Sequence, residues 1–519
     1  MNTIDIDIKI SKKIISSRNS NNIKNLFLIY HKKEINLFEY INNFIKVNTK
    51  YKKLIDKIES SLKKKQSKAL ITILNEEENN MVYNLVLFSI DLDKNLNILN
   101  DHLRHCGVEI YENIHQNSLT NINILNTLKT DYVYCIVEGL VMSKYKFNKY
   151  KTKNNDINKT QNKLVLNINS VSRINQDKIN RLKIIINSVY LARDLTNEPP
   201  NVLNPETFPN IIKTIIKKYN LSISYKLYNT NQLKKMNMNL LVSVGKSNKK
   251  ESESKLLILE YKPKNNNNNK KNNDNNKPII LLGKGVTYDT GGLNLKDSYN
   301  SLIEGKTDMA AAAVMLSFLL GYSQMNGKEN IILYIPIAEN NLDSRSTKVG
   351  DIIKSHKGLT VEVTDTDGEG RLMMADCLSH IIKNYPESKI IDMATLTGQQ
   401  ESVSCKLFSS VMGTNNKKIN NDIIKIGELI NEPMIEIPIL NSYEEKIKST
   451  IADIKNYSEE CSADMIISAM FLKQFINKNT NWTHIDIAGS SYKMTDINKI
   501  YNGEASGIGV RLLFELFSK

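Results

Sequence analysis

The sequence is poor in cysteine, and its cysteines form no recognisable pattern. The five are far apart and show no Cys-x-x-Cys spacing: Cys106, Cys135, Cys377, Cys405 and Cys461. This argues against a disulfide framework and against a thiolate zinc finger. No apolar stretch reaches the roughly 18 residues that a membrane span requires. The N-terminus carries Asp5 where a signal peptide needs a basic residue. We therefore expect a reduced, cytoplasmic protein without a membrane partner.

Three common functional motifs are also absent. None of the seven histidines lies in a His-Glu-x-x-His pattern, which disfavours a single-zinc protease of the histidine type. Neither the phosphate-binding pattern G-x-x-x-x-G-K-[ST] nor the dinucleotide pattern G-x-G-x-x-G occurs. A nucleotide-phosphate cradle is thus not expected.

The composition is that of a folded protein with a basic surface. Its 519 residues are 41% hydrophobic and 24% charged, enough for two or more domains with a sizeable core. The net charge of +15 raises the question of nucleic acid or anionic membrane as a partner. No zinc finger, RNA-recognition signature or basic-aromatic interleaving supports nucleic acid, so that partner stays an unsupported alternative.

The hydrophobic pattern indicates two α/β domains. Isoleucines alternate with charged residues over Ile4–Ile10, which is typical of a half-buried strand. From Asp177 onward, apolar residues recur at the spacing of a helix. An Asn/Lys-rich tract, residues 265–277, is interpreted as a disordered loop inserted between two strands. We predict a smaller N-terminal α/β domain over 1–170, a linker helix over 171–198 and a larger C-terminal α/β domain over 199–519. Further strands are expected at Leu26–Tyr30, Ala69–Leu74, Val82–Leu87, Leu256–Tyr261 and Ile279–Leu282.

Strand and helix patterns alternate through the C-terminal half. Alternation of this kind predicts a mixed, mostly parallel sheet covered on both faces, with ligands beyond the carboxyl ends of its strands. The expected strands are Ile331–Ile337, Thr360–Val363, Ile390–Thr395 and Thr483–Ile487, and the expected helices are Leu372–Ile382, Ala463–Phe475 and Gly507–Phe517.

Two clusters of polar residues follow predicted strands. Gly283–Lys296 places Lys284 between two glycines, where a lysine can shift its pKa and act as a neutral ligand or a catalyst. Asp365–Leu372 crowds three carboxylates onto a strand-to-helix turn, for which a divalent cation is the natural counter-charge. Arg371 opens the predicted helix, where an anion is also favoured. Asp308 precedes an Ala-rich helix, and on its own it is most simply a helix-terminal acid.

Taken together, these residues resemble the leucyl aminopeptidase (cytosol aminopeptidase) family of two-metal peptidases. Asp365–Leu372 is similar to the family signature Asn-Thr-Asp-Ala-Glu-Gly-Arg-Leu. It differs at two positions, where Asp365 replaces the asparagine and Gly368 replaces the alanine. Gly283–Gly292 matches the family's Gly-Lys-Gly segment throughout. The resemblance extends from Val189 to the C-terminus, and every presumed metal ligand is present.

The resemblance implies a metal-dependent aminopeptidase that removes the N-terminal residue of peptides and assembles as a homohexamer. Lys284, Asp289, Asp308 and Glu369 would hold one metal, and Asp289, Asp367 and Glu369 the second. Lys296 would polarise the scissile carbonyl, and Arg371 would hold a bicarbonate ion that acts as general base. Zinc or manganese is expected, with cobalt or magnesium as alternatives.

Two positions depart from the family pattern. Gly305 and Ser491 stand where relatives often carry methionines that line the pocket for the substrate side chain. A changed pocket with retained chemistry is therefore expected. The competing interpretations are a DNA-binding protein and a non-catalytic scaffold paralogue.

Overall fold

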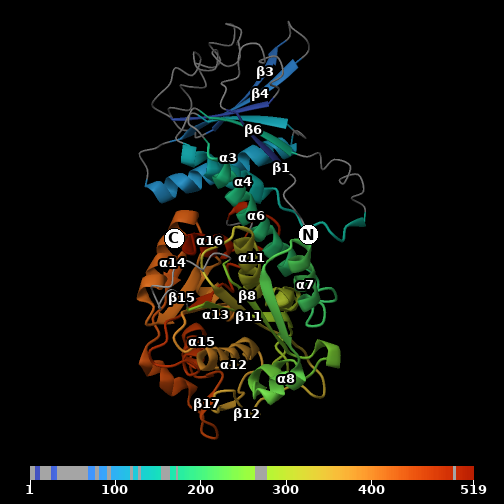
Figure 1. Ribbon diagram of the computed structural model, residues 1–519, viewed down its shortest axis with the longest axis vertical. Coiled ribbons are helices and arrows are strands. Elements are labelled where there is room, and N and C mark those ends of the chain that lie inside the picture. The colour runs from blue at the N-terminus through green and yellow to red at the C-terminus, as the bar shows by residue number, and fades with distance from the viewer. Residues whose placement is uncertain are drawn as a thin grey trace. The chain divides into compact units, whose positions relative to one another are not determined.

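The computed structural model describes residues 6–11, 25–31, 68–75, 81–90, 95–116, 121–126, 130–152, 164–170, 174–263, 277–494 and 498–518 (Figure 1). The chain forms two compact units that divide between Ile186 and Asn187. This point lies inside helix α6 (Gln176–Asn197), which covers most of the stretch predicted as a linker helix. Most of the Asn/Lys-rich tract and the first residues of the Ile4–Ile10 alternation lie outside the described residues. Among the described helices, none has the length and apolarity to cross a membrane.

The N-terminal unit is built on a sheet in the order β1-β6-β5-β2-β4-β3, in which only the β3–β4 pair is antiparallel. The predicted strands of this half coincide with β2, β3 and β4. Helices α3 and α4 of this unit pack closely: a Cβ atom on Gly107 of α3 would lie 2.1 Å from the carbonyl oxygen of Ile136 on α4. The elements are β1 (Ile6–Ser11), β2 (Asn25–His31), β3 (Lys68–Asn75), β4 (Met81–Ile90), α3 (Leu96–Gln116), β5 (Asn121–Asn126), α4 (Thr130–Ser143) and β6 (Leu164–Ser170).

The C-terminal unit contains a larger sheet in the order β16-β15-β18-β14-β9-β11-β8-β7, with β10 also paired to β11. Its centre, β18-β14-β9-β11, is parallel, and antiparallel pairs join this centre to the strands at each side. The predicted mixed, mostly parallel sheet is confirmed. The strands are β7 (Ile223–Tyr228), β8 (Lys255–Tyr261), β9 (Ile279–Gly283), β10 (Gly285–Asp289), β11 (Ile331–Asn340), β14 (Ile390–Ala394), β15 (Ser409–Thr414), β16 (Met434–Glu436) and β18 (Trp482–Asp486).

Helices cover both faces of this sheet. Met373 and Cys377 of α12 share a buried cluster with Ile280 and Leu282 of β9. Leu281 points to the opposite face because side chains alternate along a strand. There α11 lies so close that a side chain on Gly283 would come within 2.9 Å of the Ala312 Cα atom. The helices are α7 (Phe208–Lys218), α8 (Thr230–Lys235), α9 (Asn239–Val244), α10 (Tyr299–Glu304), α11 (Ala310–Gln324), α12 (Glu369–Asn384), α13 (Gly398–Ser404), α14 (Lys417–Ile430), α15 (Asp464–Lys473) and α16 (Val510–Leu516).

Two local expectations differ from the structure. The predicted strand Thr360–Val363 corresponds to β13 (Thr360–Glu362), which belongs to a separate three-stranded sheet with β12 (Ile352–Lys354) and β17 (Ile454–Lys455). Helix α12 begins at Glu369, so Arg371 is its third residue and does not open it. Glycine has a low helix propensity, which made Gly370 look like part of the turn. Glu369 is nevertheless well placed in a first helical turn, because its charge complements the helix dipole.

Candidate metal centre

Lys284 lies between β9 and β10, at the edge where the parallel strands of the large sheet end. Its Nζ atom lies 2.7 Å from Asp308 Oδ1 and 2.9 Å from Glu369 Oε1, and it donates a hydrogen bond to the Thr395 carbonyl oxygen at 2.8 Å. Burial by itself lowers the pKa of Lys284, but the nearby carboxylates outweigh it and raise that pKa. The lysine is an ammonium in this arrangement, so it must lose a proton before it can ligate a metal.

Lys296 forms a second bridge between carboxylates. Its Nζ atom lies 2.8 Å from Asp289 Oδ2 and 2.6 Å from Asp367 Oδ1. The other Asp289 oxygen accepts hydrogen bonds at 2.9 Å from the Gly291 N–H and from the Asn340 side chain. Two backbone or amide donors and an ammonium thus hold Asp289 in one orientation.

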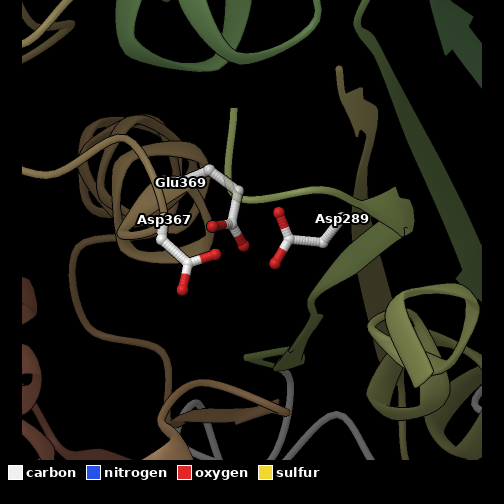
Figure 2. A group of neighbouring side chains, drawn as sticks. All are labelled: Asp289, Asp367 and Glu369. Carbon is white, nitrogen blue, oxygen red and sulfur yellow. The ribbon is translucent and has the colours of Figure 1, made fainter. Parts of the chain in front are cut away.

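Three of the carboxylates converge on one point (Figure 2). Asp289, at the end of β10, Asp367, in the loop before α12, and Glu369, on α12, point toward one another. Each offers one oxygen, and these oxygens all lie within 4.8 Å of one another. They are the three residues expected for the second metal. Asp308 joins them through Lys284, so the structure brings all five predicted ligands together.

The electrostatics show an excess of negative charge. Each lysine is shared by two carboxylates, and in each set one carboxyl group has a raised pKa. Burial raises the pKa of Asp308 well above its usual range, and burial together with Asp289 and Glu369 raises the pKa of Asp367 to about 7. Burial opposes ionisation of Asp289 as well, but Lys296 and Lys284 lower its pKa on balance. Asp308 Oδ2 and Glu369 Oε2 are buried without a hydrogen-bond partner.

Glycines make the close approach of these groups sterically feasible. A Cβ atom on Gly370 would lie 2.4 Å from Lys284 Cε, so only glycine leaves room for the lysine. Gly291 has a φ of +86°, and a Cβ atom there would lie 3.0 Å from Asp367 Oδ1. The glycines of both sequence clusters therefore have a steric role beside the ligands.

Arg371 is buried behind the cluster. Its Nη1 atom donates to the Asn456 carbonyl oxygen at 2.9 Å, and its Nη1 and Nη2 atoms lie 2.9 and 3.0 Å from the two carboxylate oxygens of Asp464. Burial alone would lower the pKa of Arg371, but pairing with Asp464 raises it. The guanidinium is a permanent cation with its own carboxylate partner.

Several residues of the site were not identified from the sequence. Asn340 orients Asp289, Thr395 donates to Asp308 Oδ1 at 2.9 Å, and Asp464 pairs with Arg371. Asn340 and Thr395 stand at the ends of the central strands β11 and β14, which is a signal that could have singled them out. Asp464 carries no such local signal.

The two positions that depart from the family pattern are both buried. A Cβ atom on Gly305 would lie 2.5 Å from the Asp289 carbonyl oxygen, so a larger residue would require a backbone shift. Ser491 donates a hydrogen bond to the Ala488 carbonyl oxygen at 3.0 Å and is 4% exposed.

Comparison with known proteins identifies the family of this site. Residues 190–514 match the catalytic domain of the cytosol aminopeptidase family. The chain belongs to this family. A probable cytosol aminopeptidase of Protochlamydia amoebophila is 33% identical over 408 residues, covering 77% of this chain and 78% of the relative. Another, from Shewanella oneidensis, is 33% identical over 378 residues, covering 73% and 71%. The chain is therefore an aminopeptidase, as the sequence motifs predict, and this favours an enzyme over a non-catalytic scaffold.

Solved structures support the fold of this chain. The bottromycin maturation enzyme BotP in complex with Mn superposes with a TM-score of 0.75, and a second structure of BotP superposes with a TM-score of 0.74. Each comparison covers 95% of this chain and 98% of the other at 20% sequence identity. At this level of identity the likeness shows a shared fold and nothing further.

Proposed function

We propose that this aminopeptidase removes the N-terminal residue of peptides with the help of two divalent metal ions. The observation that supports this proposal is the convergence of the Asp289, Asp367 and Glu369 carboxylate oxygens at the carboxyl edge of the sheet. Lys284, Asp289, Asp308 and Glu369 are the proposed ligands of one ion. Asp289 and Glu369, together with Asp367, are those of the other.

The donor set fits divalent cations. Four carboxylates face two ammonium groups, which leaves two negative charges without compensation when all four are ionised. Buried charge of this kind is costly unless it is paired or coordinates a metal. The buried, unpartnered oxygens of Asp308 and Glu369 offer lone pairs for such coordination. Carboxylate-rich ligation suits manganese or magnesium. The family resemblance points to zinc, manganese or cobalt.

When bound, a pair of divalent ions lowers the pKa of water and stabilises the negative charge that develops during peptide hydrolysis. The chain's own groups then have separate tasks. Lys296, whose side chain is 21% exposed, can donate to the scissile carbonyl oxygen once its carboxylate partners are engaged elsewhere. Asn340 and Gly291 keep Asp289 oriented.

The preferred N-terminal residue is proposed to differ from leucine. Gly305 and Ser491 present no bulky apolar side chain where the family resemblance places methionines. A panel of aminoacyl-fluorophore substrates tests this proposal, since leucine derivatives should hold no large advantage. Cleavage of leucine derivatives far faster than all others would count against a changed pocket.

The two-metal proposal is tested with the same substrates, assayed with added manganese and with a chelator. Glu369→Ala removes a ligand of both ions and should abolish turnover. Glu387→Ala is the matched control, since Glu387 is an exposed residue that pairs with Lys277. Turnover that persists in chelator, or in Glu369→Ala, would contradict the mechanism.

Assembly and location are further parts of the proposal. The family resemblance favours a homohexamer in the cytoplasm. Light scattering coupled to size-exclusion chromatography tests the assembly, and a monomeric mass would contradict it.

A further inference from the structure

The surroundings of Arg371 do not fit the bicarbonate ion that the family resemblance assigns to it. Bicarbonate is a small planar anion that would bind the guanidinium through two oxygens. In the structure the two carboxylate oxygens of Asp464 already take that place, at 2.9 and 3.0 Å from Nη1 and Nη2. A two-pronged pair of this geometry is the strongest form of arginine–carboxylate contact.

Asp464 is held in place by its own element. It is the first residue of α15, where the helix dipole favours a negative charge. The Met465 N–H donates to Gln399 Oε1 at 2.9 Å, which fixes the start of α15 beside α13. The Ser468 hydroxyl donates to the Asp464 carbonyl oxygen at 2.7 Å. The carboxylate is therefore preorganised and needs no rearrangement to meet Arg371.

Charge balance also disfavours a second anion. The side chain of Arg371 is 3% exposed, and Asp365 and Glu369 act on its charge in addition to Asp464. Its Nε atom is buried without a hydrogen-bond partner, so this donor could still meet an anion. An anion at that donor would enter a buried region where carboxylates already outnumber the guanidinium, at a desolvation cost.

We infer that Asp464 supplies from within the chain the anion that Arg371 would otherwise take from solution, so that catalysis does not depend on bicarbonate. Asp464 is in this sense a positioning residue, which acts through Arg371. The inference rests on the proposed function only in taking the carboxylate cluster as the catalytic centre.

The first experiment compares wild-type turnover in degassed, bicarbonate-free buffer with turnover in buffer containing sodium bicarbonate, at matched pH and ionic strength. We expect the two rates to agree within about twofold. A saturable increase with bicarbonate, which sodium chloride does not reproduce, would overturn the inference.

The second experiment removes the internal anion. Asp464→Ala should lose about tenfold or more in kcat/KM, and bicarbonate or formate should restore part of it, because the buried guanidinium regains a partner. Asp464→Glu should retain more activity than Asp464→Ala. Glu459→Ala, an exposed carboxylate five residues earlier, is the control and should behave as wild type. An Asp464→Ala variant that is folded and fully active, or one that is impaired but unaffected by either anion, would also overturn the inference.

A binding measurement separates this inference from the proposed function. Thermal unfolding midpoints should rise with bicarbonate in Asp464→Ala and stay constant in wild type, whether or not metal is present. Asp464→Asn replaces the alanine variant if that variant does not fold, and the wild-type comparison decides if neither folds. Loss of all metal-dependent turnover in wild type would refute the proposed function, whereas a bicarbonate-dependent midpoint in wild type would refute the internal anion.

Discussion

Replacing Gly370 by alanine offers a direct test of how the site is assembled. The new Cβ atom would lie 2.4 Å from Lys284 Cε and 2.7 Å from Lys284 Nζ, closer than real Cβ contacts allow. Lys284 has little freedom to move away, because it is 2% exposed and bonded to Asp308, Glu369 and the Thr395 carbonyl within 2.9 Å. We therefore expect the lysine to lose its position between the carboxylates.

The effect on activity should exceed the effect on stability. Overpacking of a buried site costs about 1–3 kcal/mol, while alanine is better than glycine in a helix by about 1 kcal/mol. The net loss of unfolding free energy is therefore expected at roughly 0–2 kcal/mol. A displacement of a site group by about 1 Å can reduce the rate by about 100-fold. Gly370→Ala should thus be folded and nearly inactive.

The assay combines aminoacyl-fluorophore turnover with added manganese and urea denaturation of the same preparation. Gly398→Ala is the matched control for stability, since no heavy atom lies within 4 Å of its new Cβ atom and it also stands at a helix start. Its free energy of unfolding should not fall. A Gly370→Ala enzyme with wild-type turnover and stability would refute the steric reasoning.

Three further predictions follow from buried ionisable groups. Burial raises the pKa of Asp376 to about 7, so between about pH 4 and pH 7 the folded state holds a proton that the unfolded state has lost. This group therefore destabilises the fold progressively as pH rises from about 4 to 7, and its full cost is present above pH 7. The unfolding free energy of Asp376→Asn relative to wild type should therefore increase by up to ~4 kcal/mol from pH 4 to pH 8 in urea denaturation, and parallel pH profiles of the two proteins would contradict this. Asp392 accepts hydrogen bonds from the Trp482 and His484 side chains, all fully buried, so Asp392→Ala should lose about 3–5 kcal/mol of unfolding free energy. A loss below about 1 kcal/mol would show that the pair is not needed. Manganese binding should weaken as pH falls below about 7, because Asp367 must be ionised to act as a ligand; calorimetry that gives the same affinity at pH 6 and pH 8 would contradict this role.

Much of the fold was predictable because its signals are local. Apolar runs such as Ile279–Leu282 and Ile390–Thr395 are bounded by turn residues, and they became the central strands β9 and β14. The start of α12 was misplaced because Gly370 is a poor helix former that is retained to make room for Lys284. That requirement arises from a residue 86 positions earlier in the chain and cannot be seen in the local pattern.

The sequence by itself determined the chemical identity of the site. The motifs around Lys284 and Glu369 carry the proposed ligands, and their residue types alone indicate an oxygen-rich cation site. The tertiary structure decided which groups balance one another, because the parallel strands and α12 bring together residues far apart in the chain. Arg371 and Asp464 show this most clearly: they are 93 positions apart, and only the packing of α12 and α15 makes Asp464 the partner of Arg371. The energy of an ion pair depends on the distance between the two charges in space, and this distance cannot be predicted from their separation along the chain.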